Sequence, residues 1–160
     1  MNIYIEPHGC AMSYGEAEIM RYLLEESGHA VVNDACAADA IILHTCIVIE
    51  STERKMVTRL KKFTETGKIL IVSGCMVGAR EKEILESAPE SILIQPGDIA
   101  RVQNVIGNGS KNRSPKNLTP DATVISTIPI ATGCIGNCDF CITRIARGAL
   151  RSYSYEEILQ

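Results

Sequence analysis

Short apolar runs alternate with helical patterns through the first hundred residues of this 160-residue chain. Continuous apolar runs, such as residues 40–43, are typical of strands that are buried on both faces. Strands separated by helices imply a parallel sheet with right-handed crossovers. Five strands favour the flavodoxin-like order 2-1-3-4-5 of an α/β fold, with helices on both faces of the sheet. The predicted strands cover residues 3–5, 30–32, 40–43, 69–72 and 92–94.

Helical spacing of apolar residues fills the intervals between these strands. Ser13 and Glu16 form the pattern of a capping box, which predicts a helix that begins there, carries an apolar stripe over residues 19–24 and ends at Gly28. The segment 54–63 predicts an amphipathic helix with a solvated basic face. Two further helices are predicted, one that ends before Pro89 and one over residues 99–106 with a turn and cap at residues 96–98.

A change of composition divides the chain into three parts. Residues 1–107 form the predicted α/β domain, and residues 108–121 hold one apolar residue among many turn formers, so they are predicted to be a linker. Residues 122–160 begin a second unit, with a predicted strand over 124–130, a Cys-rich loop and a helix start near residues 154–157. A chain of 160 residues is long enough for one well-buried domain and short of two ordinary ones.

Charge differs between the two ends of the chain. Residues 1–107 carry 10 Lys and Arg against 15 Asp and Glu, whereas residues 108–160 carry 6 against 4. A basic segment beside an acidic domain is compatible with a nucleic-acid partner, although a solvated linker explains the same charges.

Composition also narrows the class and location. Charged residues make up 22% of the chain, which excludes a disordered or low-complexity class. No apolar run approaches the roughly 20 residues that a membrane-spanning helix needs, and the first residues lack the layout of a signal peptide. A cytoplasmic protein with no membrane partner is therefore expected.

Seven cysteines point to metal or redox chemistry rather than to disulfides. Cys10, Cys46 and Cys75 each follow the end of a predicted strand, and these three strands are neighbours in the order 2-1-3-4-5. The three thiols are therefore predicted to lie at the carboxyl edge of the sheet, where open α/β sheets bind ligands, in a position to hold a metal or cluster. Cys36 follows no such strand end and is predicted to be a bystander.

A second group has the spacing C-x3-C-x2-C and comprises Cys134, Cys138 and Cys141. One short loop of this kind can bind three irons of a 4Fe–4S cluster and leave the fourth iron open. Structural zinc competes for such thiols but needs four closed ligands, and no His lies nearby to complete the set. The spacing therefore favours an iron–sulfur loop over zinc.

These motifs resemble a known family. The loop 134–141 resembles the signature of radical S-adenosylmethionine enzymes. Together with the upstream motifs His8-Gly9-Cys10, Thr45-Cys46 and Ser73-Gly74-Cys75-Met76, it resembles the methylthiotransferases. The segments 52–56 and 143–153 resemble the archaeal and eukaryotic branch, which acts on N6-threonylcarbamoyladenosine at position 37 of tRNA. The resemblance covers essentially the whole chain.

The resemblance implies two 4Fe–4S clusters and S-adenosylmethionine as cofactors. Cys134, Cys138 and Cys141 would hold the cluster that binds and cleaves S-adenosylmethionine, giving a radical that takes the hydrogen from C2 of the modified adenine. Cys10, Cys46 and Cys75 would hold the second cluster, which carries the sulfur to be transferred. Phe140 would lie against the adenine of the cofactor. The candidates for contact with tRNA phosphates are Arg144, Arg147 and Arg151, and solvation at the surface is an equal alternative for them.

Two features of the chain depart from the family. His44 stands where the family usually has Asn, and Ser13 stands where Asn is frequent. Only 19 residues follow Cys141, so residues 122–160 are expected to supply just the first β/α unit of an incomplete radical S-adenosylmethionine barrel. The chain is therefore expected to be an N-terminal part of the enzyme and inactive alone.

The residues alone are also compatible with three other functions. They are a different radical S-adenosylmethionine enzyme that shares the Cys loop, a methylthiotransferase of a ribosomal protein, and a non-catalytic metal or redox module. A flavin site is less favoured, because residues 10–13 form no Gly-rich phosphate loop. The sequence identifies neither the electron donor nor the sulfur source.

Overall fold

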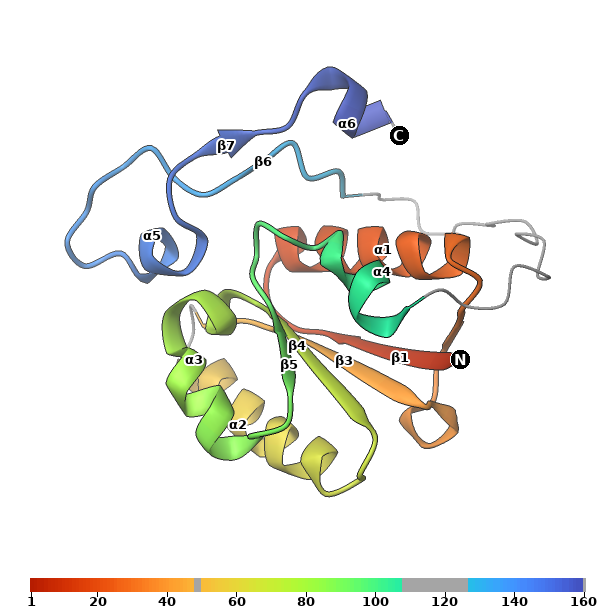
Figure 1. Ribbon diagram of the computed structural model, residues 1–160. Coiled ribbons are helices and arrows are strands. Elements are labelled where there is room, and N and C mark those ends of the chain that lie inside the picture. The colour runs from red at the N-terminus through yellow and green to blue at the C-terminus, as the bar shows by residue number, and fades with distance from the viewer. Residues whose placement is uncertain (48–49, 108–126, 160) are drawn as a thin grey trace.

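The computed structural model describes residues 1–47, 50–107 and 127–159. Its first part is a five-stranded parallel sheet in the order β2-β1-β3-β4-β5, which confirms the predicted α/β fold and strand order (Figure 1). The strands are β1 (Asn2–Pro7), β2 (Ala30–Val32), β3 (Ala40–Thr45), β4 (Ile69–Gly74) and β5 (Ile92–Ile94). The helices of this part are α1 (Ala11–Glu26), the 3-10 turn η1 (Ala35–Ala37), α2 (Glu50–Thr64), α3 (Cys75–Ser87) and α4 (Arg101–Ile106).

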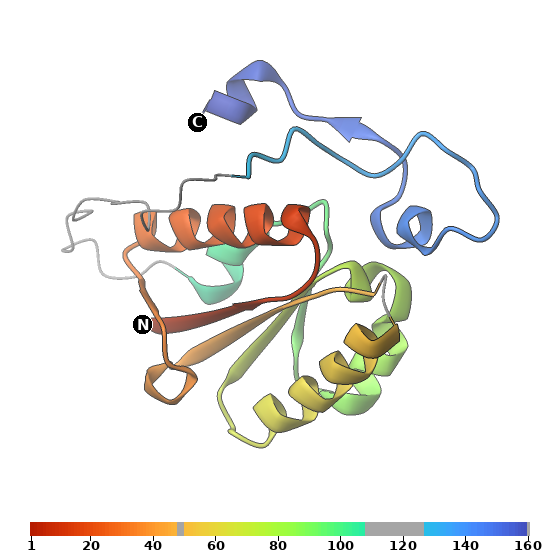
Figure 2. The same cartoon turned by 180° about the vertical axis from the view of Figure 1, so that it is seen from behind.

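Helices cover both faces of the sheet. Figures 1 and 2 show α1 and α4 on one face and α2 and α3 on the other. Successive side chains of a strand point to opposite faces, so Ile41 and Leu43 pack under α2 and α3 while Ala40 and Ile42 pack under α1 and α4. This two-sided burial explains why residues 40–43 of β3 form an uninterrupted apolar run.

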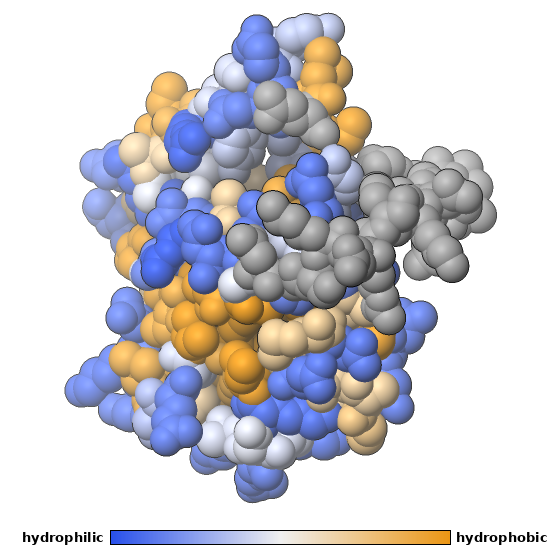
Figure 3. Space-filling model, turned by 45° about the vertical axis from the view of Figure 1, so that its right-hand side comes forward, coloured by the Kyte–Doolittle hydropathy of each residue, from blue (hydrophilic) through white to orange (hydrophobic). Residues whose placement is uncertain are grey.

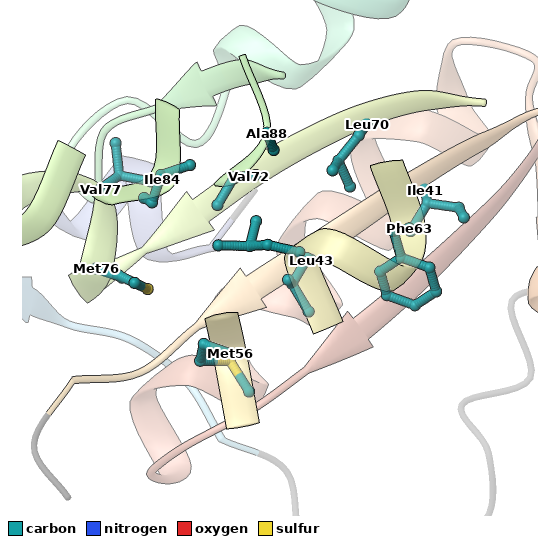
Figure 4. Close-up of a cluster of buried hydrophobic side chains, with 11 residues drawn as sticks. Ile41, Leu43, Met56, Phe63, Leu70, Val72, Met76, Val77, Ile84 and Ala88 are labelled. Atoms are coloured by element: carbon teal, nitrogen blue, oxygen red, sulfur yellow. The ribbon is translucent and has the colours of Figure 1, made fainter. Parts of the chain in front are cut away.

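The core between the sheet and helices α2 and α3 is shown in Figure 4. Met56, Leu60 and Phe63 of α2 belong to this core, with at most 2% of each residue exposed. Removing a side chain of this size from water stabilises the fold by about 1.5–3 kcal/mol. The predicted amphipathic helix is therefore confirmed, with its apolar face on the sheet.

Two helix starts differ from the prediction. Cys10, not Ser13, is the N-cap of α1, and both Ser13 and Glu16 are fully buried inside the helix. The capping-box interpretation is wrong because the helix begins directly after the strand-end turn, and Glu16 bonds to other parts of the chain. Likewise α4 begins at Arg101 with Ala100 as its N-cap, so Asp98 closes the preceding turn and does not cap the helix.

Residues 127–159 form a small second part. It contains β6 (Ala131–Thr132), α5 (Ile142–Arg147), β7 (Arg151–Ser152) and α6 (Tyr155–Leu159), and β6 pairs with β7 in antiparallel orientation. The predicted strand over 124–130 is misplaced, because residues 127–130 are in no strand and β6 follows them. Residues 124–126 and the predicted linker 108–121 lie outside the described residues.

The start of α6 agrees with the prediction near residues 154–157. The Ser154 backbone N–H donates to the Glu157 carboxylate at 2.7 Å, and the Glu157 N–H donates to the Ser154 hydroxyl at 3.2 Å. This reciprocal pair is a capping box.

The second part buries few of its own side chains. Between residues 127 and 159 only Thr132 and Ala146 are buried, and many apolar residues are exposed, including Ile135 at 86% and Leu159 at 65%. Figure 3 shows apolar side chains gathered on one face of the molecule between hydrophilic ones. Among the helices described, none has the length and apolar character to span a membrane.

Candidate functional site

Cys10, Cys46 and Cys75 meet at the carboxyl edge of the sheet. Thr45 of β3 is paired with Gly74 of β4, so Cys46 and Cys75 occupy equivalent positions one residue further along their strands. Cys10 follows β1, the neighbour of β3 on its other side, and is the N-cap of α1. The strand register therefore gathers these three residues at one edge, as predicted.

Two glycines allow the backbone to approach closely here. A Cβ placed on Gly9 would lie 2.7 Å from the Cys46 Cβ and 2.9 Å from its sulfur. A Cβ on Gly74 would lie 2.2 Å from the Thr45 carbonyl oxygen. Both residues have positive φ, +120° and +89°, which favours glycine. The edge of the sheet that holds Cys10, Cys46 and Cys75, called the cysteine edge below, therefore depends on the glycines that precede Cys10 and Cys75.

The environment differs between these thiols. Cys10 is exposed, whereas Cys46 and Cys75 are each 4% exposed. Burial alone would raise the pKa of Cys10, but hydrogen bonds from Ser13 and the Met12 backbone, with the charge of Arg147, lower it below its ordinary value. Burial raises the pKa of Cys75, and the nearby Arg147 opposes that effect only in part. Cys10 is therefore the more readily ionised of the two.

A buried polar row lies beside the three cysteines. The carboxylate of Glu16 and the ring of His44 are both 0% exposed, and His44 Nε2 lies 3.1 Å from Glu16 Oε2. The other ring nitrogen, Nδ1, lies 2.8 Å from the Ser73 hydroxyl, which in turn lies 3.9 Å from the sulfur of Met20. His44 thus links helix α1 to strand β4 under the cysteine edge.

Arg147 of α5 completes this row from the second part of the chain. Its NH1 and NH2 groups donate to the two oxygens of Glu16 at 2.6 and 2.8 Å, and its Nε donates to the Cys75 sulfur at 3.0 Å. Burial alone would raise the pKa of Glu16, but the hydrogen bonds and charge of Arg147, together with the neighbouring His44 ring, lower it below its ordinary value. The side chain of Arg147 is only 7% exposed, so its bonds are directed inward in this structure.

The loop of the second cysteine group is held by its own backbone and by Arg144. The Gly136 N–H donates to the Cys134 sulfur at 3.3 Å. A Cβ on Gly136 would lie 3.5 Å from the Cys134 sulfur and 3.8 Å from that of Cys138. Arg144 NH1 donates to the carbonyl oxygens of Cys134 and Gly136, both at 2.8 Å. Two of the three thiols therefore face one small space beside a residue that has no side chain.

Cys141 stands at the start of α5. Backbone N–H groups of Arg144 and Thr143 lower the pKa of its thiol below the ordinary value. A thiol at a helix N-terminus ionises more easily, and the thiolate is the form that binds metal.

The two cysteine groups supply six thiol donors. No group of three or more His, Cys, Asp or Glu side chains within the described ranges is close enough to hold one metal ion. In a 4Fe–4S cluster each thiolate binds a different iron, so the sulfurs surround the cluster rather than one ion. Thiolates are the ligands that iron–sulfur clusters select.

The remaining predicted residues lie on the surface. Phe140 is 91% exposed. Arg151 is exposed, pairs with Glu157 at 3.3 Å and lies over the ring of Tyr153. Cys36 is exposed in η1, away from the sheet edge that holds the cysteine trio. Contacts of Phe140 with a cofactor and of Arg144, Arg147 and Arg151 with tRNA stay predictions.

The sequence did not reveal the roles of Glu16 and Ser73. Glu16 fits a capping-box pattern, so its spacing gave a local explanation that hid the contact with Arg147, 131 residues away. Ser73 precedes Gly74-Cys75 and was visible only as part of that motif. The one available signal was a carboxylate in a helix whose neighbours Ala17 and Met20 are apolar.

A family model matches most of the first part of the chain. A family described as "Uncharacterized protein family UPF0004" matches residues 2–95. The chain belongs to this family. The matched range covers β1 to β5 and includes Cys10, Cys46 and Cys75, whereas the loop 134–141 lies outside it.

Relatives match nearly the whole chain. A protein of Pyrococcus abyssi named "Probable threonylcarbamoyladenosine tRNA methylthiotransferase" is 36% identical over 99% of this chain and 40% of its own length. A protein of Methanocaldococcus jannaschii with the same name is 31% identical over 99% of this chain. "Ribosomal protein uS12 methylthiotransferase RimO" of Acaryochloris marina is 32% identical over 94%. This UPF0004 chain spans about 40% of the length of the relatives it matches.

Proposed function

We propose that the chain is the N-terminal part of a radical S-adenosylmethionine methylthiotransferase that modifies C2 of N6-threonylcarbamoyladenosine at position 37 of tRNA. Cys10, Cys46 and Cys75 would hold one 4Fe–4S cluster. The other cluster would be held by Cys134, Cys138 and Cys141. When bound, the clusters would supply the electron that cleaves S-adenosylmethionine and the sulfur that is transferred.

The observation that carries this proposal is the meeting of Cys10, Cys46 and Cys75 at one edge of the sheet. These residues are 29 to 65 positions apart in sequence, yet paired strands bring them to the same edge. Two of the three thiols are shielded from water, because Cys46 and Cys75 are each 4% exposed, whereas Cys10 is exposed. A partly shielded site made of thiols suits cluster binding, since burial and contacts to sulfur set cluster properties.

The protein's own residues would bring the two sites near each other. Gly78 of α3 and Ala146 of α5 allow the helices to touch, so α5, which directly follows Cys141, lies against the helix that begins at Cys75. Many apolar side chains of residues 127–159 are exposed, as expected for a segment that packs against further chain in a complete enzyme. Residues 127–159 would accordingly supply only the first part of the radical S-adenosylmethionine barrel.

The tRNA substrate rests on the relatives. Those named as tRNA methylthiotransferases reach 36% identity, and those named as uS12 methylthiotransferases reach 32%. A ribosomal-protein substrate is therefore the alternative. Nucleoside mass spectrometry of tRNA from a strain that lacks the complete gene tests the choice. Loss of the methylthio form of threonylcarbamoyladenosine supports the proposal, and unchanged tRNA with unmodified uS12 supports the alternative.

The cluster assignment is tested by iron content after anaerobic reconstitution of the full chain. We expect about eight irons per chain, two clusters of four. Cys10→Ser and Cys138→Ser each change an exposed thiol, one in each group, and each should lower the iron to about four. Cys36→Ser changes an exposed thiol outside both groups and should leave it at about eight. About four irons per unaltered chain would favour a different radical S-adenosylmethionine enzyme. Bound zinc without cluster absorbance would favour a non-catalytic metal module.

A further inference from the structure

Arg147 lies in the second part of the chain, is nearly buried, and touches the sheet edge that holds Cys10, Cys46 and Cys75. Its guanidinium bonds to Glu16 through two nitrogens and to the Cys75 sulfur through the third. A planar guanidinium has its donors in a fixed fork, so the bidentate pair with Glu16 fixes where Nε points. The contact with sulfur is therefore set by the carboxylate.

Glu16 is in turn held from behind. Its carboxylate is fully buried, and His44, also fully buried, lies 3.1 Å from Oε2. His44 is anchored by the Ser73 hydroxyl at 2.8 Å, two residues before Cys75. Removal of one partner of a buried ion pair strongly destabilises the packed state, because the other charge is left buried without compensation.

The same contact joins the two parts of the chain. α5 lies against α3 where a Cβ on Gly78 would meet the Ala146 carbonyl oxygen. Ile47, Cys75 and Ala146 form a small apolar cluster next to it. Arg147 is the residue after Ala146, so the ion pair lies directly beside this helix contact.

We propose that Arg147 is a positioning residue, which Glu16 orients so that it fixes α5 on the cysteine edge and donates a hydrogen bond to the sulfur of Cys75. The docking of α5 and the surroundings of Cys75 are coupled through this one side chain. The effect on a bound cluster rests on the proposed function, whereas the docking contact does not.

The docking contact is tested on the full chain without iron. Alkylation rates of Cys75 and of the exposed Cys36 are measured by peptide mass spectrometry. Arg147→Met keeps the length of the side chain and removes its charge, so we expect Cys75 to react about tenfold faster or more, because loss of a buried pair partner frees the segment. Cys36 should react at its original rate.

The matched control is Arg151→Met, which makes the same change at the exposed pair with Glu157. It should leave the Cys75 rate unchanged. Equal Cys75 rates in the two variants would overturn the docking role. Residues 1–107 have their own core, and circular dichroism of each variant confirms that it is folded. Glu16→Gln should reproduce the effect of Arg147→Met from the other side of the pair.

The hydrogen bond to sulfur is tested by a potential. In a background with Ser at positions 134, 138 and 141, only the site of Cys10, Cys46 and Cys75 can bind a cluster. Arg147→Lys keeps a cation beside Glu16, but one ammonium cannot also reproduce the fork and the Nε donor. We expect the midpoint potential to shift lower, because a hydrogen bond to a ligand sulfur stabilises the reduced, more negative cluster.

Arg151→Lys in the same background should leave the potential unchanged. An unchanged potential in Arg147→Lys with the iron content retained would overturn the positioning role at the sulfur. Absence of iron in the background chain would count against the proposed function instead, and the alkylation rates would still decide whether Arg147 docks α5.

Discussion

A Cβ added to Gly78 would lie 2.0 Å from the carbonyl oxygen of Ala146. Gly78 is in the first turns of α3, and Ala146 is near the end of α5, so two helices from different parts of the chain meet with no side chain between them. A real Cβ cannot occupy such a position without movement of backbone. The contact therefore requires glycine at position 78, although its φ is not positive.

Gly78→Ala should displace α5 from α3. Forcing a methyl group against backbone in a packed contact costs about 1–3 kcal/mol, so hydrogen exchange of residues 142–147 should rise while that of β3 and β4 stays slow. Gly97→Ala is the control, because a Cβ at Gly97 would meet nothing within 4 Å. Unchanged exchange of residues 142–147 in Gly78→Ala would contradict the close contact.

Ile71→Ala should destabilise the α/β domain. Ile71 is 0% exposed in the centre of the sheet, and loss of such a side chain costs about 2–5 kcal/mol. Ile69 lies two residues earlier on the same strand and is 45% exposed, so Ile69→Ala should cost far less. Urea unfolding of both variants measures the difference, and equal costs would show that burial on β4 is misassigned.

Glu6 should make the free energy of unfolding depend on pH in the acidic range. Burial alone would raise the pKa of Glu6, but hydrogen bonds and charge from Arg59 and His8 lower it below its ordinary value. A lowered folded-state pKa stabilises the protein above the unfolded pKa, and this contribution is lost as pH falls through the folded pKa. Arg59 is part exposed, so the pair contributes roughly 1 kcal/mol at neutral pH.

Glu6→Gln measures this contribution. The variant should unfold at lower urea than the unaltered chain at pH 7, and the gap should narrow as the pH falls below the ordinary pKa of a glutamate. Glu18 is the control carboxylate, since its pair with Arg21 is exposed, and Glu18→Gln should change stability little at either pH. A gap that stays constant with pH would mean that Glu6 is not the titrating group.

The sheet could be predicted because its residues carry the signal locally. Each run of apolar residues, such as 40–43 and 69–72, lies in one strand, and glycines and prolines mark the turns between them. The strand order followed from the number of strands and the handedness of crossovers. Cys46 and Cys75 could then be placed at one edge because each directly follows a strand.

The buried polar row of Glu16, His44, Ser73 and Arg147 could not be predicted from the sequence. Glu16 and Arg147 each have a local explanation that competes with their contact. Glu16 has the spacing of a capping box with Ser13, and Arg147 stands in a basic segment where contact with phosphate is a reasonable expectation. Only the docking of α5 on α3 brings the two together, and that depends on Gly78 and Ala146, which have little side chain to signal it. Contacts between distant elements are decided by packing, which sequence spacing does not show.

Arg144→Ala should weaken the loop 134–141 without undocking α5. Arg144 NH1 donates to the carbonyl oxygens of Cys134 and Gly136, so its removal frees two acceptors of the loop at a cost of about 1–3 kcal/mol. After reconstitution and gel filtration, the variant should retain about four irons instead of about eight. The remaining iron would belong to the proposed site of Cys10, Cys46 and Cys75, because the hydrogen bonds lost with Arg144 are those to the loop.

Arg151→Ala removes a charge of the same sign from the exposed surface of the same segment and should retain both clusters. Cys75 should stay protected from alkylation in the iron-free Arg144→Ala chain, because Arg147 keeps its bonds to Glu16. Full iron retention in Arg144→Ala would mean that the loop keeps its shape through backbone bonds alone, such as that from the Cys141 N–H to the Cys138 carbonyl oxygen at 3.1 Å.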